Sequence, residues 1–314
     1  MGLLMLGTLK IFQRDGKMVD PKRDSPRLCA QQEHLFSMPL SPPAIHPPTA
    51  DVPVLLSVPH AGRDYPEWLI AMSKGGHPAL HSLEDPLVDE LVAGAVEAGV
   101  GAVIARAPRA AIDCNRGEDE IDPTVVRSGP IASLSPRARG GLGIVPGRTP
   151  THGSLWRQPI ARHELEERLE EAHRPYHRAV ETQLAGLLDR YGCALLLDCH
   201  SMPPPDGGPQ VIIGDRYGQS SEAWITAEAV KVVASMGFRV GVNQPFAGGH
   251  VIQRHGAPSS GIHALQIEVD RCCYMASDDR SPGPGFIRTA RLFEQLAIRL
   301  GQFLLDRRFA QAAE

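Results

Sequence analysis

The sequence predicts an α/β protein, folded as a three-layer α/β/α sandwich around a mixed, mostly parallel sheet. Short apolar segments alternate along the chain with longer segments of helical periodicity. The apolar segments contain few polar positions, which is typical of strands that helices cover on both faces. With 314 residues, 42% of them hydrophobic, the chain is long enough to bury the core of one large domain.

The predicted elements begin at residue 52. An apolar run with β-branched residues predicts a buried strand at 52–58. Apolar residues at helical spacing predict a helix at 86–99, and a second strand is expected at 101–107. The segment 128–159 is rich in glycine and proline, so we expect an irregular loop there.

The second half of the chain continues the alternation. The segment 160–192 is strongly helical; Pro175 should divide or kink this helix, and Gly192 should end it. The remaining predictions are strands at 193–198, 210–215 and 262–270, and helices at 221–237 and 285–308. The sequence contains no internal repeat and no glycine-rich nucleotide-binding motif.

Residues 1–50 are expected to form an N-terminal extension outside the domain. The apolar start is soon interrupted by Lys10 and Arg14, so it is too short to span a bilayer and makes a poor signal peptide. Residues 13–50 are polar and then Pro-rich, which is typical of a poorly ordered arm. We therefore expect a single catalytic domain at 51–310.

Composition narrows the class of partner. The net charge of −4 gives no electrostatic reason to expect nucleic acid or an anionic membrane, and the 5% of aromatic residues is low for a base-stacking surface. The six cysteines have no CxxC spacing, so a reducing compartment, the cytoplasm, fits best. A small-molecule partner is expected, and the oligomeric state stays open.

Polar side chains stand at the expected carboxyl ends of the strands. The first strand is followed by His60, and the segment LLLDCHSMPP at 195–204 runs from apolar residues into Asp198 and His200. Because ligands bind beyond the carboxyl ends of strands in open α/β sheets, these side chains should converge. A single histidine after a strand is more often structural, but two at neighbouring strand ends favour a metal site. The strand at 101–107 leads to Arg109, Asp113, Asn115 and Arg116, the strand at 210–215 ends in Asp215 and Arg216, and the strand at 262–270 carries Asp270 and Arg271 at its end.

Glu268 lies in a strand of alternating apolar and polar residues. One interpretation is a half-exposed antiparallel strand with its polar face in water. The other is a functional carboxylate, because the rest of the sheet looks buried and an unpaired charge there would be costly. In the neighbouring motif, alternation directs Cys199 and His200 to opposite faces, so a Cys–His nucleophile pair is unlikely from geometry and Cys199 is expected in the core.

A series of motifs occurs in order within 52–306: VPHAGRDYP, LEDPLVDEL, RAAIDCNRGED, RPYHRAVE, LLLDCHSMP, IGDRYG, NQPFAGGHVIQRHG and HALQIEVDRCCYM. Together they resemble the N-formylglutamate amidohydrolase family. The resemblance implies the phosphorylase/hydrolase-like α/β sandwich, which is shared with zinc carboxypeptidases and aspartoacylase-like acylases. It also implies hydrolysis of N-formyl-L-glutamate to formate and glutamate, a step of histidine catabolism.

The resemblance further implies a single Zn²⁺ ion with two histidine ligands, His60 and His200. Zinc peptidases usually carry a Glu three residues after the first histidine, in an HxxE motif. That motif is broken here, because Arg63 occupies the position. An acid from elsewhere must complete the site, and Asp85 is the preferred candidate. Its competitors are Asp64 and Glu84.

The same resemblance implies roles for the remaining candidates. Glu268 resembles the catalytic glutamate that activates water at the metal and later passes its proton to the leaving amine. Asn115 and Arg116 resemble the pair that holds a substrate carboxylate, a role for which the guanidinium fork is well suited. Arg109 and Arg271 are further substrate-binding candidates, able to face the developing oxyanion.

Two alternative functions stay open. One is another N-acyl amino acid amidohydrolase of the same superfamily, which would share the metal chemistry and differ in its acyl group or amino acid. The other is a non-catalytic binding protein on this fold. The broken HxxE motif supports the second alternative, whereas the presence of His60, His200 and Glu268 opposes it.

Overall fold

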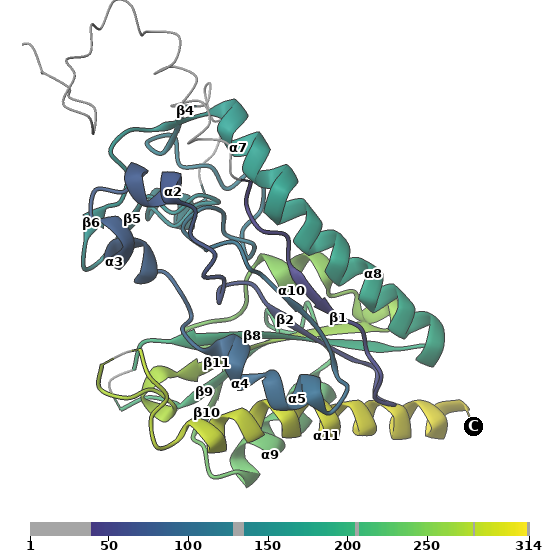
Figure 1. Ribbon diagram of the computed structural model, residues 1–314. Coiled ribbons are helices and arrows are strands. Elements are labelled where there is room, and N and C mark those ends of the chain that lie inside the picture. Colours follow the sequence, from purple (N-terminus) through teal and green to yellow (C-terminus); the bar gives the residue numbers. More distant parts are fainter. Residues whose placement is uncertain (1–38, 128–134, 205–206, 279, 313–314) are drawn as a thin grey trace, which may run out of the picture.

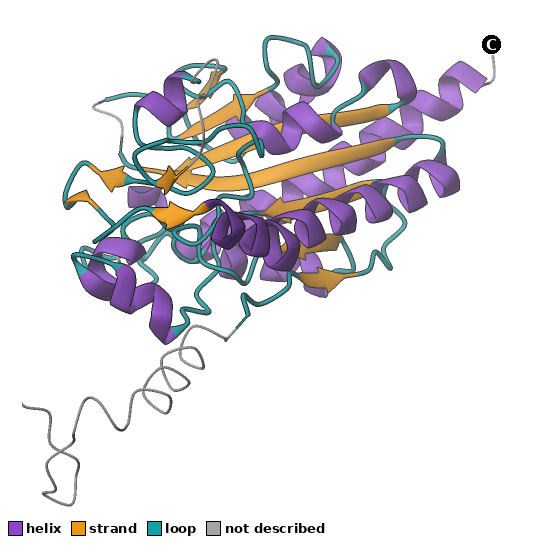
Figure 2. Cartoon of the chain, turned by 90° about the horizontal axis from the view of Figure 1, so that it is seen from above, coloured by secondary structure: helices purple, strands orange, loops and turns teal. Residues whose placement is uncertain are grey.

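The computed structural model describes residues 39–127, 135–204, 207–278 and 280–312, and its centre is a seven-stranded sheet (Figures 1 and 2). In spatial order the strands are β1 (Ala44–His46), β3 (Gly101–Ile104), β2 (Val54–Val58), β8 (Ala194–Met202), β11 (Ile262–Asp270), β9 (Val211–Gly214) and β10 (Val240–Val242). The β1–β3 and β11–β9 pairs are antiparallel and the other pairs are parallel. The predicted mixed, mostly parallel sheet is thus confirmed.

Helices cover both faces of this sheet (Figure 1). One layer consists of α4 (Val88–Leu91), α5 (Ala93–Glu97), α9 (Ala223–Ser235) and α11 (Phe286–Ala312). The opposite layer contains α8 (Arg174–Tyr191) and α10 (His250–His255). The side chains of Leu195, Leu197 and Cys199 pack towards the first layer, whereas Leu196 packs towards the second. The three-layer sandwich and the core position of Cys199 are both as predicted.

The helix predicted at 160–192 is interrupted where Pro175 occurs. α7 (Arg162–Arg168) passes into a π-helical turn (Leu169–His173) and then into α8, whose first turn contains Pro175. A proline lacks the backbone N–H and crowds the preceding turn, which favours a widened turn at that point. Gly192 ends α8 with a φ of 68°, a left-handed conformation that costs glycine little.

Several elements depart from the predicted boundaries. β8 reaches Met202 instead of ending at 198, and the helix predicted at 86–99 is broken at Val92 into α4 and α5. Within the predicted extension, poor order does not hold for residues 44–46, because β1 pairs with β3 and Leu40 is buried. Residues 1–38 lie outside the described part of the chain. Elements that were not predicted include β10 and α10.

Short elements surround the carboxyl end of the sheet. The 3₁₀ turn Pro258–Ser260 lies apart from them, directly before β11 at the opposite end of that strand. The surrounding elements are α2 (Glu67–Met72), α3 (Gly76–His81), β4 (Val126–Arg127), α6 (Pro136–Arg139), β5 (Arg148–Thr149), β6 (Gly153–Ser154), β7 (Ile160–Ala161) and the 3₁₀ turn Arg271–Cys273. With α7 they enclose a second apolar cluster, which includes Leu69, Ile144 and Leu155. The described part of 128–159 is therefore mostly irregular, as predicted, but is well packed. Among the described helices, none is both long and apolar enough to cross a membrane.

Candidate active site

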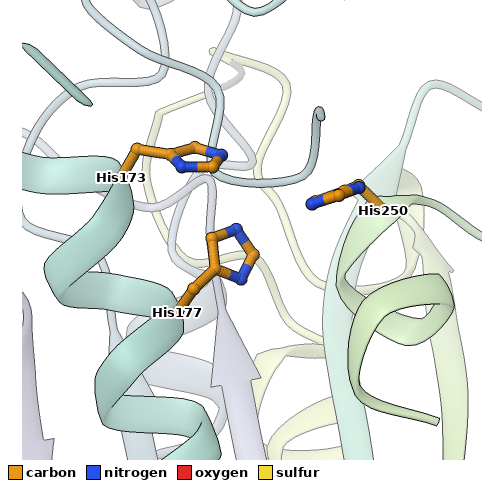
Figure 3. A group of neighbouring side chains, drawn as sticks. All are labelled: His173, His177 and His250. Carbon is orange, nitrogen blue, oxygen red and sulfur yellow. The ribbon is translucent and has the colours of Figure 1, made fainter. Parts of the chain in front are cut away.

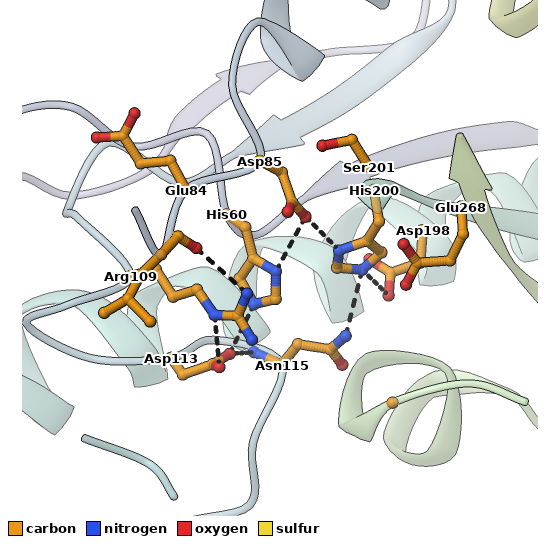
Figure 4. Close-up of polar contacts among 12 residues, drawn as sticks. His60, Glu84, Asp85, Arg109, Asp113, Asn115, Asp198, His200, Ser201 and Glu268 are labelled. Carbon is orange, nitrogen blue, oxygen red and sulfur yellow. Dashed lines mark hydrogen bonds and ion pairs between the residues drawn. The ribbon is translucent and has the colours of Figure 1, made fainter. Parts of the chain in front are cut away.

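The carboxyl ends of three parallel strands bring the candidate residues together (Figure 4). His60 follows β2, while His200 and Glu268 lie on the neighbouring strands β8 and β11, where they are register partners. Asp85 comes from the turn before α4, and its backbone N–H donates to the His60 carbonyl oxygen at 3.1 Å. Asp215 does not join this group, because β9 runs antiparallel to β11 and its carboxyl end lies at the other end of the sheet.

His60, Asp85 and His200 form a compact, buried group, which we call the acid–histidine cluster. Asp85 Oδ2 lies 3.2 Å from His60 Nδ1 and 2.9 Å from His200 Nδ1. The two rings meet edge to face with centroids 4.8 Å apart. The three side chains can offer one ligand atom each within 4.8 Å of one another, so the geometry brings the predicted trio together.

Each histidine of this cluster uses its second nitrogen on another carboxylate. His60 Nε2 lies 2.7 Å from Asp113 Oδ1, and His200 Nε2 lies 2.9 Å from Asp198 Oδ2. A carboxylate accepts, so each Nε2 carries a proton and each neutral ring presents the Nδ1 lone pair to Asp85. Three lone-pair-bearing atoms then face one another, an arrangement that requires a cation between them or an extra proton on each ring.

This pattern fits a divalent metal. Histidine ligands commonly donate their other ring N–H to a carboxylate, which fixes the tautomer and raises the basicity of the ligating nitrogen. A set of two imidazoles and one carboxylate is a ligand set typical of catalytic zinc, with a fourth position left for water or substrate. Asp113 and Asp198 had no assigned role in the sequence. Strand alternation could have found Asp198, because it lies two residues before His200 on the same face.

The two competing acids have other partners. Asp64 is half-exposed and pairs with Arg106 at 2.8 Å. The carboxylate of Glu84 accepts from the Tyr65 hydroxyl and lies 2.9 Å from His81 Nε2. Neither carboxylate belongs to the acid–histidine cluster, so the geometry favours Asp85 as the third ligand.

Charges around the cluster are strongly coupled. Burial alone would raise the pKa of Asp85, but hydrogen bonds from His200 and His60 hold it well below the usual range. Burial would likewise raise the pKa of Asp113, yet Arg109 and His60 lower it strongly. For His200, burial acts to lower the pKa, whereas the Asp198 charge and the bonds to Asp198 and Asp85 raise it well above normal. The site thus strongly favours positive charge between its carboxylates.

Glu268 points to the same side of the sheet as His200. Its Oε1 accepts from Gln266 Nε2 at 2.8 Å, and Gln266 is the register partner of Asp198. Glu268 is only 8% exposed, and burial raises its pKa to about 7, with Asp85 and Asp198 adding to the rise and His200 opposing it. A carboxyl group that changes its protonation near neutral pH is suited to proton transfer.

Four further polar candidates lie around the acid–histidine cluster, and three of them contact its residues or Asp113. Arg109 Nε donates to Asp113 Oδ2 at 2.9 Å, and Arg271 Nη2 donates to Asp85 Oδ1 at 3.3 Å. Asn115 Nδ2 lies 3.2 Å from His200 Nε2. Arg116 is more distant: its guanidinium donates to the carbonyl oxygens of Leu142 and Asn115, at 2.8 and 2.7 Å. Their substrate roles stay predictions.

Comparisons with known proteins agree with this fold. The model of the N-formylglutamate amidohydrolase family (FGase) matches residues 52–275. An N-formylglutamate deformylase of Pseudomonas aeruginosa is 30% identical over 243 residues, which cover 74% of this chain and 84% of the relative. Another, from Pseudomonas putida, is 29% identical over 237 residues, covering 71% and 82%.

A solved structure extends the similarity to three dimensions. The crystal structure of N-formylglutamate amidohydrolase from Ralstonia eutropha JMP134 superposes with a TM-score of 0.78 at 26% identity, covering 85% of this chain and 99% of the other. These findings confirm the resemblance seen in the motifs, the predicted fold class and the assignment to the amidohydrolase enzymes. Because the family model matches well over half of its residues, the chain belongs to the N-formylglutamate amidohydrolase family.

Proposed function

We propose that this protein hydrolyses the formamide bond of N-formyl-L-glutamate, releasing formate and L-glutamate, with a divalent metal, Zn²⁺, at the acid–histidine cluster. One observation carries the metal part of the proposal. His60 and His200 direct Nδ1 towards Asp85, while each Nε2 is bonded to a carboxylate of its own. The family and the names of its relatives support the substrate part.

The metal would be held by His60 Nδ1, His200 Nδ1 and a carboxylate oxygen of Asp85. Bound there, zinc supplies Lewis acidity and lowers the pKa of water towards neutrality. The protein's part is to keep the two rings in the correct tautomer through Asp113 and Asp198. Ser57 supports this arrangement, because its hydroxyl donates to the remaining oxygen of Asp198 at 2.7 Å.

Glu268 is the proton carrier in this proposal. A formamide is a stable amide, so hydrolysis needs a base that takes a proton from the attacking water and an acid that delivers one to the leaving amine nitrogen. Glu268 can do both in turn, because burial raises its pKa to about 7. The hydrogen bond from Gln266 fixes one of its oxygens and leaves the other to exchange protons.

Recognition of the substrate falls to the surrounding cations. N-formyl-L-glutamate carries two carboxylates, so it needs more than one positive partner. Arg109 and Arg271 are held near the cluster by acidic partners, and Arg116 and Asn115 lie in the segment that supports His60. We infer that Asn115 and Arg116 hold one substrate carboxylate, whereas Arg109 or Arg271 faces the developing oxyanion.

The proposal includes a single catalytic domain in a reducing, cytoplasmic setting. Four of the described cysteines fit this setting, since Cys114, Cys193, Cys199 and Cys273 are free thiols. Cys273 follows Glu268 closely in the chain, so an oxidising compartment would expose a thiol near the site to oxidation.

A substrate panel tests the proposal. Purified full-length protein is assayed for product release from N-formyl-L-glutamate, N-formyl-L-glutamine and N-acetyl-L-glutamate. The glutamine compound removes the side-chain carboxylate and the acetyl compound enlarges the acyl group. N-formyl-L-glutamate should give the highest kcat/KM. A higher value for the acetyl compound would assign the enzyme to another N-acyl amino acid, and no turnover on any N-acyl amino acid would favour a binding protein.

A further inference from the structure

A second group of histidines consists of His173, His177 and His250 (Figure 3). His173 ends the π-helical turn, His177 follows one helical turn later on α8, and His250 begins α10. Their side chains, which we call the histidine cluster, can offer one nitrogen each within 4.8 Å of one another. The spacing of four residues between His173 and His177 places both rings on one face of the helix.

Each of these three histidines has a nitrogen without a hydrogen-bond partner among the described residues. The atoms are His173 Nδ1, His177 Nε2 and His250 Nε2. Both His173 and His177 are completely buried, at 0% exposure. A buried polar atom without a partner is costly, so three of them in one group of neighbouring rings are unusual and need an explanation.

The partnered nitrogens indicate which tautomers are present. His173 Nε2 lies 2.9 Å from the Arg116 carbonyl oxygen, which can only accept, so this nitrogen carries the proton and Nδ1 holds a lone pair. His177 Nδ1 lies 2.9 Å from His255 Nε2. With His177 as the donor of that bond, its Nε2 also holds a lone pair. Both rings then present to the shared space the form that binds a metal.

Acidic groups take no direct part in the histidine cluster. The nearest carboxylate oxygen, Glu118 Oε1, is 4.0 Å from His173 Nδ1, and Glu118 is bound by two nitrogens of Arg174. Burial and the neighbouring histidines lower the pKa of His177 strongly, and burial lowers that of His250 to about 4. Among the described residues, no carboxylate oxygen therefore lies within hydrogen-bond distance of the three rings.

We propose that His173, His177 and His250 form a second metal site, an all-histidine site for a divalent transition metal such as Zn²⁺. Imidazole is a good ligand for zinc, copper, nickel and iron, and three histidines with an open fourth position are a known zinc arrangement. Zn–N bonds of about 2.0 to 2.1 Å would require only small shifts of rings that already face one another.

The position of the site suggests what the metal would do. His250 lies between two backbone amides that bind the first site: Gly249 N donates to Gln266 Oε1 at 2.7 Å, and Val251 N donates to Asn115 Oδ1 at 2.8 Å. His173 binds the Arg116 carbonyl oxygen. A metal here would join α8 and α10 and hold Asn115 and Arg116 in place, so its role is structural and positioning.

Metal stoichiometry tests this inference without any measurement of activity. Chelator-treated full-length protein is dialysed against Zn²⁺ and its bound metal is determined by mass spectrometry, for the wild type, His177→Ala, and the double variant His60→Ala/His200→Ala. The wild type should bind two ions per chain, and each of the two variants should bind one. A combined triple variant should bind none.

Two further variants keep the outcome interpretable. His250→Ala alters a half-buried ring at the start of α10, so it serves if His177→Ala fails to fold by circular dichroism. His263→Ala is the control, because His263 is also buried with an unpartnered Nδ1 but stands apart from both groups; it should bind two ions. One ion in the wild type, lost in the double variant, would overturn the second site and leave the first intact. Two ions in both His177→Ala and His250→Ala would also overturn it.

Discussion

The acid–histidine cluster and the histidine cluster are built from the same side chain, but their surroundings are opposite. In the first, both ring nitrogens of His60 and His200 lie against carboxylates. In the second, the partners of His173 and His177 are a carbonyl oxygen and another imidazole. Carboxylates raise the pKa of His200 well above normal, whereas burial among histidines lowers that of His177 well below it.

We propose that this difference separates a reactive site from a supporting one. Carboxylates around the first cluster stabilise a cation strongly and hold a proton carrier, Glu268, beside it. The second cluster offers neutral ligands with nothing to transfer protons. We therefore expect changes at the first cluster to alter catalysis and changes at the second to alter metal content and stability.

The largest effect is expected from Glu268→Gln, which keeps the shape and removes the proton carrier. Because general acid–base groups contribute about 10² to 10⁴ in rate, kcat should fall by that factor while both metals stay bound. Glu84→Gln is the matched control, since Glu84 is also buried with a pKa raised to about 7 but bonds to Tyr65. Metal loss in Glu268→Gln would make Glu268 a ligand, and equal kcat values in both variants would deny it a catalytic role.

A smaller effect is expected when the partners of the ligands are changed. Asp198→Asn removes the charge behind His200 and should weaken zinc binding at the first cluster by about 10- to 100-fold. His255→Gln changes the corresponding partner of His177 and should cost less, because a neutral hydrogen bond is weaker than a charge-assisted one. Zinc titrations monitored by calorimetry compare the two. Equal losses of zinc affinity in the two variants would show that the carboxylate partners do not make the first cluster bind zinc differently from the second.

Arg116 lies between the two clusters, so changing its side chain tests whether this segment binds the substrate. Arg116→Ala should raise KM for N-formyl-L-glutamate roughly 10-fold or more, as expected for a lost charged hydrogen bond, with kcat less affected. Arg116→Lys should restore binding only in part, because lysine lacks the planar fork. Steady-state kinetics with N-formyl-L-glutamine and N-formyl-L-leucine identify which carboxylate is held. Unchanged KM values in both variants would remove Arg116 from substrate binding.

The smallest effect concerns acid stability. Burial lowers the pKa of His255 to about 3, against about 6.5 for an unfolded histidine. Below pH 6.5, His255 is protonated in the unfolded chain but stays neutral in the folded protein. The free energy of unfolding therefore decreases by about 1.4 kcal/mol for each unit that the pH is lowered, until the pKa of the folded state is reached. In the presence of a chelator, urea unfolding between pH 6.5 and 4 should show a shallower dependence in His255→Gln than in a control variant of the exposed His163. Equal slopes would contradict this assignment.

Sequence patterns predicted much of the acid–histidine cluster and none of the histidine cluster. His60, His200 and Glu268 stood at predicted strand ends, and alternation placed Glu268 and Gln266 on one face, where they are hydrogen-bonded. The contact between His60 and Asp113 depends on the path of the chain after β3, which no local pattern specifies.

The second cluster needed information that the sequence does not carry locally. His173 and His177 are four residues apart in a predicted helix, but their partner His250 comes from α10, a helix that was not predicted. The antiparallel direction of β9 was also not evident from its residues, and it removes Asp215 from the site.

We propose that hydrolysis takes place at a metal held by His60, Asp85 and His200. The most direct test measures product release from N-formyl-L-glutamate by the full-length protein after chelation and during titration with Zn²⁺, in parallel for the wild type and His200→Ala. Turnover should be lost on chelation, should return with added zinc in the wild type, and should not return in His200→Ala. Full turnover by the wild-type protein after its metal has been removed would contradict it.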